Sequence, residues 1–204
     1  MSTGQSRDFD NLRIDLHSHT TCSDGKLSPQ ELIERAVNFQ LDVLAITDHD
    51  SVAAVDSAKS YIVEKNHPIE LISGIELSTE WKNFEIHIVG LNIDHNHLAL
   101  ADLIQRQQNI RESRAIEMGK KLEKCGFVEP YNKAKELAGK ATITRTHFAR
   151  VMQEQEGFSN LQTAFDKYIG KGKRAYVKPT WCSIEEAVEV IHKAGGTAAV
   201  AHPI

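Results

Sequence analysis

Histidine and acidic side chains recur in this sequence directly after short apolar segments. His17 and His19 are separated by a single residue, and Asp24 follows shortly afterwards beside a glycine. Alternate residues of a strand point to the same side, so His17 and His19 could bind the same ion. Imidazole together with carboxylate suits Zn²⁺, Mn²⁺ or Fe²⁺. Taken alone, the His-x-His pair is equally compatible with the polar face of an edge strand.

Three further candidates occupy similar positions along the chain. His49 directly follows the apolar segment 41–47, Glu76 lies at the end of segment 69–77, and His87 lies within segment 84–91. Taken singly, His87 could be packed in the core and Glu76 could cap a helix. The carboxyl ends of parallel strands meet at one rim, so we predict that these side chains converge there. They are too many for one ion, and two or three ions are expected.

These side chains have to be positioned by alternating strands and helices. Segments 12–16, 41–47 and 69–77 have the composition of strands, and helices are predicted over 29–39 and 52–65. Ser28-Pro29-Gln30-Glu31 is typical of a capping box that opens the first helix. Lys82-Asn83 predicts a hairpin turn between strands 77–81 and 84–91. This order indicates an α/β fold with a parallel sheet.

Beyond residue 96 the pattern becomes helical and polar. Helices are predicted over 96–125, 129–139, 146–156 and 160–169, with no strand signal among them. The α/β pattern resumes at Ala175-Tyr176-Val177 and continues with a helix after Ser183 and a strand over 197–201. We therefore predict a polar tail at 1–11, α/β parts at 12–99 and 173–204, and an all-helical insertion at 100–172.

Composition narrows the class of protein. The chain has 204 residues, 41% hydrophobic and 25% charged, which is an ordinary globular balance. A net charge of −4 gives no reason to expect a protein that coats nucleic acid, and we predict no duplex DNA partner, no membrane and no protein partner. No apolar run approaches the roughly 18–20 residues of a membrane span. Cys22, Cys125 and Cys182 form no evident disulfide framework, so a cytoplasmic location is expected.

Two groups of cationic residues could hold a substrate phosphate. Arg145, His147 and Arg150 lie close together at the start of a predicted helix, and Lys171 lies between two glycines. A phosphate that is not cleaved would need such an anchor. Charged runs are also commonly just solvated surface. The predicted contacts with substrate phosphate are Arg145, His147 and Lys171.

Several short motifs together resemble those of the PHP (polymerase and histidinol phosphatase) family. They are Asp15-Leu16-His17-Ser18-His19-Thr20, Ser23-Asp24-Gly25, Ile46-Thr47-Asp48-His49, Gly74-Ile75-Glu76 and Ala201-His202-Pro203. Segments 144–150 and 168–177 resemble the branch of this family that contains RNase AM and the 3′,5′-nucleoside bisphosphate phosphatases.

The resemblance implies an irregular seven-stranded, TIM-like barrel with a helical insertion. It implies two to three divalent metal ions, with Mn favoured and Zn or Fe possible, and it adds His202 to the ligands. The resulting metal and catalytic set is His17, His19, Asp24, His49, Glu76, His87 and His202. The implied reaction is hydrolysis of nucleoside 3′,5′-bisphosphates or of the 5′ ends of short RNA, one nucleotide at a time, by a metal-activated hydroxide.

Two other functions are compatible with the same motifs. A phosphatase of the histidinol-phosphate kind would use the same metals. The family also has a late Asp-x-His pair, which is not present before Ile204. We therefore expect a barrel that is incomplete at its C-terminal end, and an inactive metal-binding fragment is the second alternative.

Overall fold

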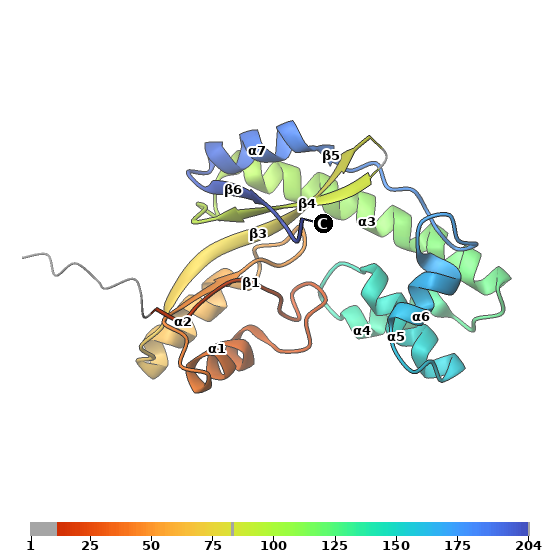
Figure 1. Cartoon of the computed structure of the whole chain (residues 1–204), viewed down its shortest axis with the longest axis horizontal. Helices are drawn as coiled ribbons and strands as arrows, with labels where there is room; N and C mark the ends of the chain where they lie inside the picture. Colours follow the sequence, from red (N-terminus) through yellow and green to blue (C-terminus); the bar gives the residue numbers. More distant parts are fainter. Residues whose placement is uncertain (1–11, 83, 204) are drawn as a thin grey trace, which may run out of the picture.

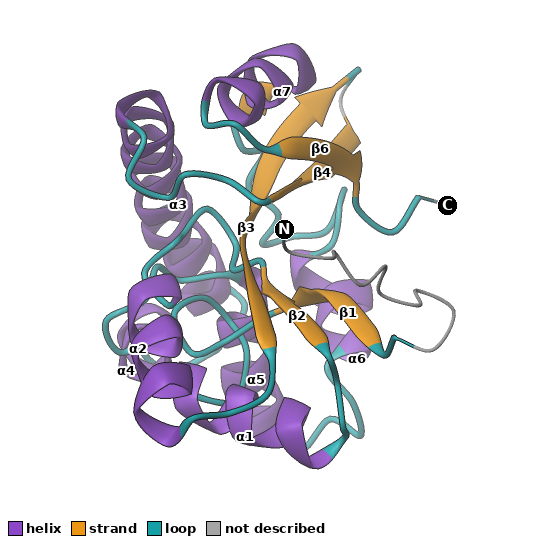
Figure 2. Cartoon of the chain, turned by 90° about the vertical axis from the view of Figure 1, so that its left-hand side faces the viewer, coloured by secondary structure: helices purple, strands orange, loops and turns teal. Residues whose placement is uncertain are grey.

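Residues 12–82 and 84–203 are described by the structure, a computed structural model. Six strands form one curled sheet in the order β1-β2-β3-β4-β6, with β5 beside β3 (Figure 2). The predicted α/β class, with a sheet that forms an incomplete barrel, is confirmed. The described residues provide six strands, whereas the resemblance implied seven. The polar tail predicted at 1–11 lies outside the described residues.

The first half of the sheet is parallel. It consists of β1 (Ile14–Ser18), β2 (Val43–Ile46) and the first part of β3 (Glu70–Trp81). Helices α1 (Pro29–Asn38) and α2 (Val55–Lys65) pack beside it around Ile33, Leu44, Ile46 and Ala58. The predicted capping box opens α1, with Ser28 and Glu31 each accepting a hydrogen bond from the other's backbone. Helix α2 begins three residues later than the predicted start at residue 52.

The second half of the sheet is antiparallel. Strand β3 pairs with β4 (Phe84–Leu91) from Gly74 onward, and β4 pairs with β6 (Thr197–Val200). Strand β5 (Cys182–Ser183) adds a short parallel pairing with β3. Helix α7 (Ile184–Lys193) covers this half, which buries Ile75, Leu77 and Ile191. The prediction of two separate strands at 69–77 and 77–81 was wrong. One strand runs through both because β4 takes over as its partner after β2 ends.

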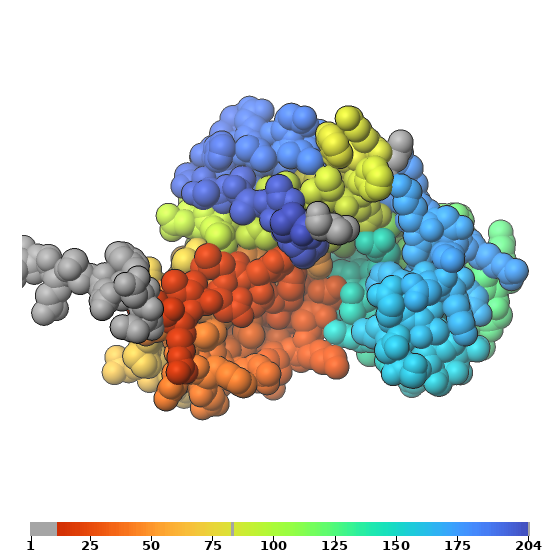
Figure 3. All heavy atoms as spheres, in the orientation of Figure 1, coloured from red at the N-terminus to blue at the C-terminus, as the bar shows by residue number. Residues whose placement is uncertain are grey.

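Helices occupy the chain between β4 and β5. They are α3 (Leu98–Lys124), α4 (Pro130–Ala138), α5 (Arg145–Glu156), α6 (Gln162–Ala164) and the π-helix η2 (Phe165–Ile169). The last four pack around the C-terminal half of α3, beside the sheet (Figures 1 and 3). They bury a core of their own that includes Met118, Leu122, Phe148 and Met152. We call α4, α5, α6, η2 and this half of α3 the helical lobe.

Helix α3 belongs to both parts of the molecule. Its first turns carry Leu100 and Leu103 into the core of the antiparallel sheet, whereas Met118 and Leu122 lie in the core of the helical lobe. The strand predicted at Ala175-Tyr176-Val177 was wrong. Ala175 is buried in the core of the helical lobe, and its N–H donates to the carbonyl of Tyr168. The boundary at residue 100 remains a prediction.

Although α3 is 27 residues long, neither it nor any other described helix is apolar enough to cross a membrane.

Candidate metal centre

Five imidazoles surround one buried carboxylate, that of Glu76. Glu76 is 0% exposed. It lies in the middle of β3, just after the point at which the strand paired with β3 changes from β2 to β4. The sequence placed it at a strand end. It does lie just beyond the carboxyl end of the parallel part, as the rim argument requires. The imidazoles come from His17, His19, His49, His87 and His202, and these contact Glu76 at 3.0–3.2 Å.

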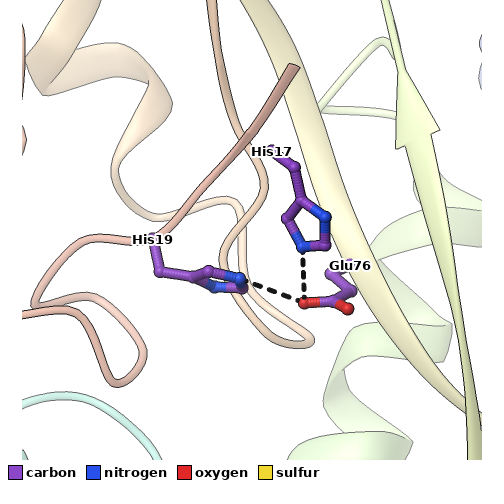
Figure 4. Close-up of side chains that lie close together, drawn as sticks. All are labelled: His17, His19 and Glu76. Carbon is purple, nitrogen blue, oxygen red and sulfur yellow. Dashed lines mark ion pairs between the residues drawn. The ribbon is translucent and has the colours of Figure 1, made fainter. Parts of the chain in front are cut away.

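The two oxygens of Glu76 have different neighbours. The Nε2 atoms of His17 and His19 lie 3.1 Å from Oε2 (Figure 4), and Nδ1 of His49 lies 3.2 Å from the same oxygen. On the other side, Nδ1 of His87 lies 3.0 Å and Nε2 of His202 lies 3.1 Å from Oε1. Glu76 can therefore bridge two groups of nitrogen donors.

Asp24 completes the cluster from the loop after β1. Its Oδ1 lies 4.0 Å from Nε2 of His49. Three donor groups overlap, each with ligand atoms within 4.8 Å of one another. They are His17, His19 and Glu76; His19, Asp24 and His49; and His49, Glu76 and His87. With His202 beside Glu76, the structure brings together all seven residues that the sequence singled out.

The contacts around Oε2 of Glu76 suit a cation better than a hydrogen-bond network. Three nitrogens lie within 3.2 Å of this oxygen. Even so, Oε2 and the Nδ1 atoms of His19 and His49 are buried without a hydrogen-bond partner in the described part of the chain. Buried polar atoms normally have a partner, and its absence in the middle of a ligand set calls for an explanation. A divalent ion bound by these atoms satisfies them, so the residues fit a metal centre.

Electrostatics keep His49 and Glu76 in the protonation states that a metal needs. Burial, together with the positive charge of Arg111, lowers the pKa of His49 to about 3. His49 is therefore a neutral imidazole at pH 7, with a lone pair available to a metal. Burial alone would raise the pKa of Glu76, but its contacts with His19 and His87 lower it below the ordinary value. The carboxylate is therefore ionised at neutral pH.

The loop that carries Asp24 is fixed by Asp48. The buried Asp48 carboxylate accepts hydrogen bonds from the backbone and hydroxyl of Thr20 and from the hydroxyl of Ser23, at 2.5–2.7 Å. Asp48 thus positions a loop and does not orient an imidazole. Gly25 has no positive φ, and a Cβ there would collide with the carbonyl group of His19. The glycine is needed for close approach of two backbones.

The metal candidates open into a cleft toward the helical lobe. Asp24, His49 and His87 line this cleft, and Arg111, Arg114 and Arg145 line it as well, together with Glu85, Phe165 and Trp181. The sequence analysis identified Arg145 but missed Arg111 and Arg114, which lie one turn apart on α3. Their spacing (i, i+3) puts both on one face of the helix, but nothing in a polar helical pattern distinguishes them from surface arginines.

The predicted phosphate contacts occupy different places. Arg145 lines the cleft and pairs with Glu85 at 2.6 Å. His147 is 2% exposed, and its Nδ1 accepts a hydrogen bond from the N–H of Thr144 at the start of α5. Lys171 lies over the ring of Phe84 and is not among the cleft residues. The anchoring roles of all three remain predictions.

The start of α5 also holds the Asp24 loop. The hydroxyl of Thr144 donates to Oδ2 of Asp24 at 3.2 Å, and Arg150 donates to the carbonyl of Asp24 at 2.7 Å. Burial alone would raise the pKa of Asp24, but the nearby imidazole of His49 and a hydrogen bond from Thr146 lower it. The helical lobe therefore takes part in positioning one of the metal candidates.

A curled α/β sheet with five imidazoles gathered around a buried carboxylate at its rim defines a protein built around a metal site. A family model described as "PHP domain" matches residues 15–197. The chain belongs to the PHP family, as its motifs indicated, and a divalent metal is the cofactor that the cluster fits.

Comparison with known proteins indicates which members of the PHP family this chain resembles. The chain is 48% identical over 192 residues to a 5′-3′ exoribonuclease of Haemophilus influenzae, covering 94% of this chain and 69% of that protein. It is 38% identical over 191 residues to a 3′,5′-nucleoside bisphosphate phosphatase of Chromobacterium violaceum, covering 93% and 66%. A solved amidohydrolase from C. violaceum, with bound sulfate and no metal, aligns with a TM-score of 0.89 at 38% identity, covering 94% and 67%. The chain thus spans about two thirds of the length of these relatives.

Proposed function

We propose that the chain carries the metal centre of a phosphoesterase that hydrolyses nucleoside 3′,5′-bisphosphates, trims the 5′ ends of short RNA, or does both. One observation carries the proposal: the imidazole and carboxylate cluster opens into a cleft that three arginines also line. Phosphate esters are the substrates that need both a metal and arginine. The names of the relatives from H. influenzae and C. violaceum support the same two substrate classes.

The predicted metal ligands are His17, His19, Asp24, His49, Glu76, His87 and His202. Their three overlapping donor groups support two to three ions, and Mn²⁺ is our first choice, with Zn²⁺ or Fe²⁺ as alternatives. When bound, such ions lower the pKa of water to give a hydroxide nucleophile and stabilise charge on the phosphoryl oxygens.

The protein's own side chains bind and orient the substrate. Arg145 is the best-placed of the predicted anchors for a second phosphate, because its guanidinium reaches the cleft and is held over the ring of Phe165. Neutral His49 and ionised Glu76 keep their lone pairs for ligation. Thr144 and Arg150 fix the Asp24 loop, so the cluster keeps its geometry when substrate enters.

The test is hydrolysis by the purified chain supplied with Mn²⁺. Phosphate release from adenosine 3′,5′-bisphosphate and mononucleotide release from a 5′-phosphorylated RNA pentamer are measured in parallel, together with bound Mn²⁺. His19→Ala should lose both activities and most of the bound metal. His192→Ala removes an exposed imidazole on α7 and is the matched control, which should retain both. Full turnover by His19→Ala, or no hydrolysis by the chain with metal bound, would refute the proposal.

The cytoplasmic location remains a prediction. It is supported by the three cysteines, which are all unpaired. Substrate is the only partner that we propose.

A further inference from the structure

Glu85 bridges two of the arginines in the cleft. Its Oε1 lies 2.7 Å from Nη2 of Arg114, and its Oε2 lies 2.6 Å from Nη2 of Arg145. The carboxylate is 15% exposed, and all three side chains line the cleft that His87 also borders. A carboxylate that accepts from two guanidinium groups occupies the kind of position in which a phosphate would bind.

The third arginine does not add charge to this wall. The guanidinium of Arg111 is 2.6 Å from Oδ2 of buried Asp50, and a hydrogen bond to the hydroxyl of Ser78 fixes it. Its charge is balanced inside the protein. Arg114 and Arg145 together with Glu85 therefore leave the cleft wall with a single net positive charge.

The Arg114 side of the pair is rigid. Its Nε donates to the carbonyl of Val177 at 3.0 Å, and its guanidinium lies over the ring of Trp181 at 5.5 Å. Burial lowers the pKa of Arg114 to about 10, so it stays cationic at neutral pH. Nε1 of Trp181 is buried with no hydrogen-bond partner in the described residues, and this indole lines the same cleft.

We propose that Glu85 determines specificity at the anchoring site. By leaving the arginine pair with one net positive charge, it favours a non-reacting phosphate with one negative charge, that of a phosphodiester. A terminal phosphate with two negative charges is disfavoured. The inference rests on the proposed function and deepens it, because it identifies the residue that sets how strongly the anchoring site discriminates a terminal phosphate from a phosphodiester.

The experiment uses two compounds that differ by one charge at the anchor. One is adenosine 3′,5′-bisphosphate, and the other is the same compound with its 5′-phosphate methylated to a diester. Both present the same 3′-phosphate for hydrolysis. For each compound, kcat/KM with Mn²⁺ and the dissociation constant without metal are measured, the latter by calorimetry. The readout is the bisphosphate-to-diester ratio.

Glu85→Gln keeps the size of the side chain and removes its charge. It should raise the ratio about tenfold, since a unit charge a few ångströms from the anchor acts on the dianion more than on the monoanion. Glu85→Asp keeps the charge and should leave the ratio near that of the unmodified chain. Glu80→Gln is the matched control, because Glu80 lies opposite Glu85 on the same hairpin, pairs with Lys178, and is outside the cleft. It changes the total charge equally and should not alter the ratio.

The outcomes separate this inference from the proposed function. An unchanged ratio in Glu85→Gln, with activity present, overturns the role of Glu85 alone. If neither compound is hydrolysed, the bisphosphate activity in the proposed function fails, and the ratio of dissociation constants still tests Glu85. No binding of either compound under any condition overturns the anchoring site itself.

Discussion

Glu76 is the residue on which the geometry of the site depends most. Its carboxylate is fully buried among five imidazoles and belongs to two of the three donor groups. Buried carboxylates are stable in proteins only when paired or when they bind a cation. Removing its charge should therefore be felt first in metal binding.

Glu76→Gln should lower the affinity for Mn²⁺ by about 100-fold or more, because even indirect partners of metal ligands account for 10–100-fold. Equilibrium dialysis measures this directly. Glu34→Gln is the control, since Glu34 pairs with Tyr61 and His67 away from the cluster. Unaltered Mn²⁺ binding by Glu76→Gln would mean that the cluster is not the metal site.

Arg111, which lines the cleft, forms a buried ion pair with Asp50, and both side chains are less than 10% exposed. Arg111→Leu should destabilise the fold by about 3–5 kcal/mol, because it leaves a buried carboxylate without its cation. Adding Asp50→Asn should recover part of that loss, as the remaining group is then neutral. Urea unfolding of the single and double variants gives both values. A double variant no more stable than Arg111→Leu would argue against this account.

Among individual residues, the convergence of the histidines was predicted from the sequence, whereas the burial of Arg111 and Arg114 was not. His17, His19 and His49 stand at strand ends in recognisable motifs, so their convergence follows from the topology of a parallel sheet. Arg111 and Arg114 lie in a long polar helix. Their burial depends on how α3 crosses the hairpin, which no local pattern encodes.

The start of α5 is the element whose chemistry the sequence did not predict. Thr144 and His147 form a capping box in which Nδ1 of His147 accepts from the N–H of Thr144. This role requires a neutral imidazole, and burial lowers the pKa of His147 to about 4. His147 thus contributes stability fully above its ordinary pKa of 6.5, and this contribution is lost as pH falls toward 4.

His147→Gln should make stability less dependent on pH. Glutamine is a good capping-box residue and does not titrate. Between pH 7.5 and pH 4, the free energy of unfolding of the unmodified chain should therefore fall by up to about 3 kcal/mol more than that of the variant. Chemical unfolding of both proteins across this range, with metal chelated, measures the difference. Parallel pH profiles would show that the imidazole is not held neutral by the fold.

Other elements show where sequence patterns suffice. The capping box at Ser28 correctly predicted the start of α1, because its side chains form hydrogen bonds with the backbone of the same short segment. The strand predicted at Ala175-Tyr176-Val177 failed, because β-prone residues here fill a helical core instead. A break in β3 at residue 77 was also wrong, because the change in partner is invisible in one strand's own sequence.

Helix α3 joins the core of the antiparallel half of the sheet to the core of the helical lobe. Its 27 residues span about 40 Å, with Leu103 in one core and Leu122 in the other. Unfolding of either core would therefore disrupt α3 and remove its packing contacts from the other core. We expect the sheet and the helical lobe to unfold together.

Leu103→Ala and Leu122→Ala should each lower stability by about 2–5 kcal/mol. In both variants, the tryptophan fluorescence of Trp81 and Trp181, both near the sheet, should follow the same transition as the far-ultraviolet circular dichroism of the helices. Coincident curves are the test of coupling. If Leu122→Ala shifts the dichroism but leaves the fluorescence midpoint unchanged, the helical lobe unfolds on its own.

The change of partner along β3 has a consequence for how this chain can vary in length. Gly74 pairs with Leu91 and Trp81 pairs with Phe84, so the register of the hairpin sets which β4 residue faces Glu76. One residue inserted within 75–81 would rotate every later side chain to the other face and separate His87 from Glu76. Residues added at the turn near Lys82 would leave that register intact. Insertions and deletions among relatives should therefore accumulate at the closed end of this hairpin and be absent from its strands.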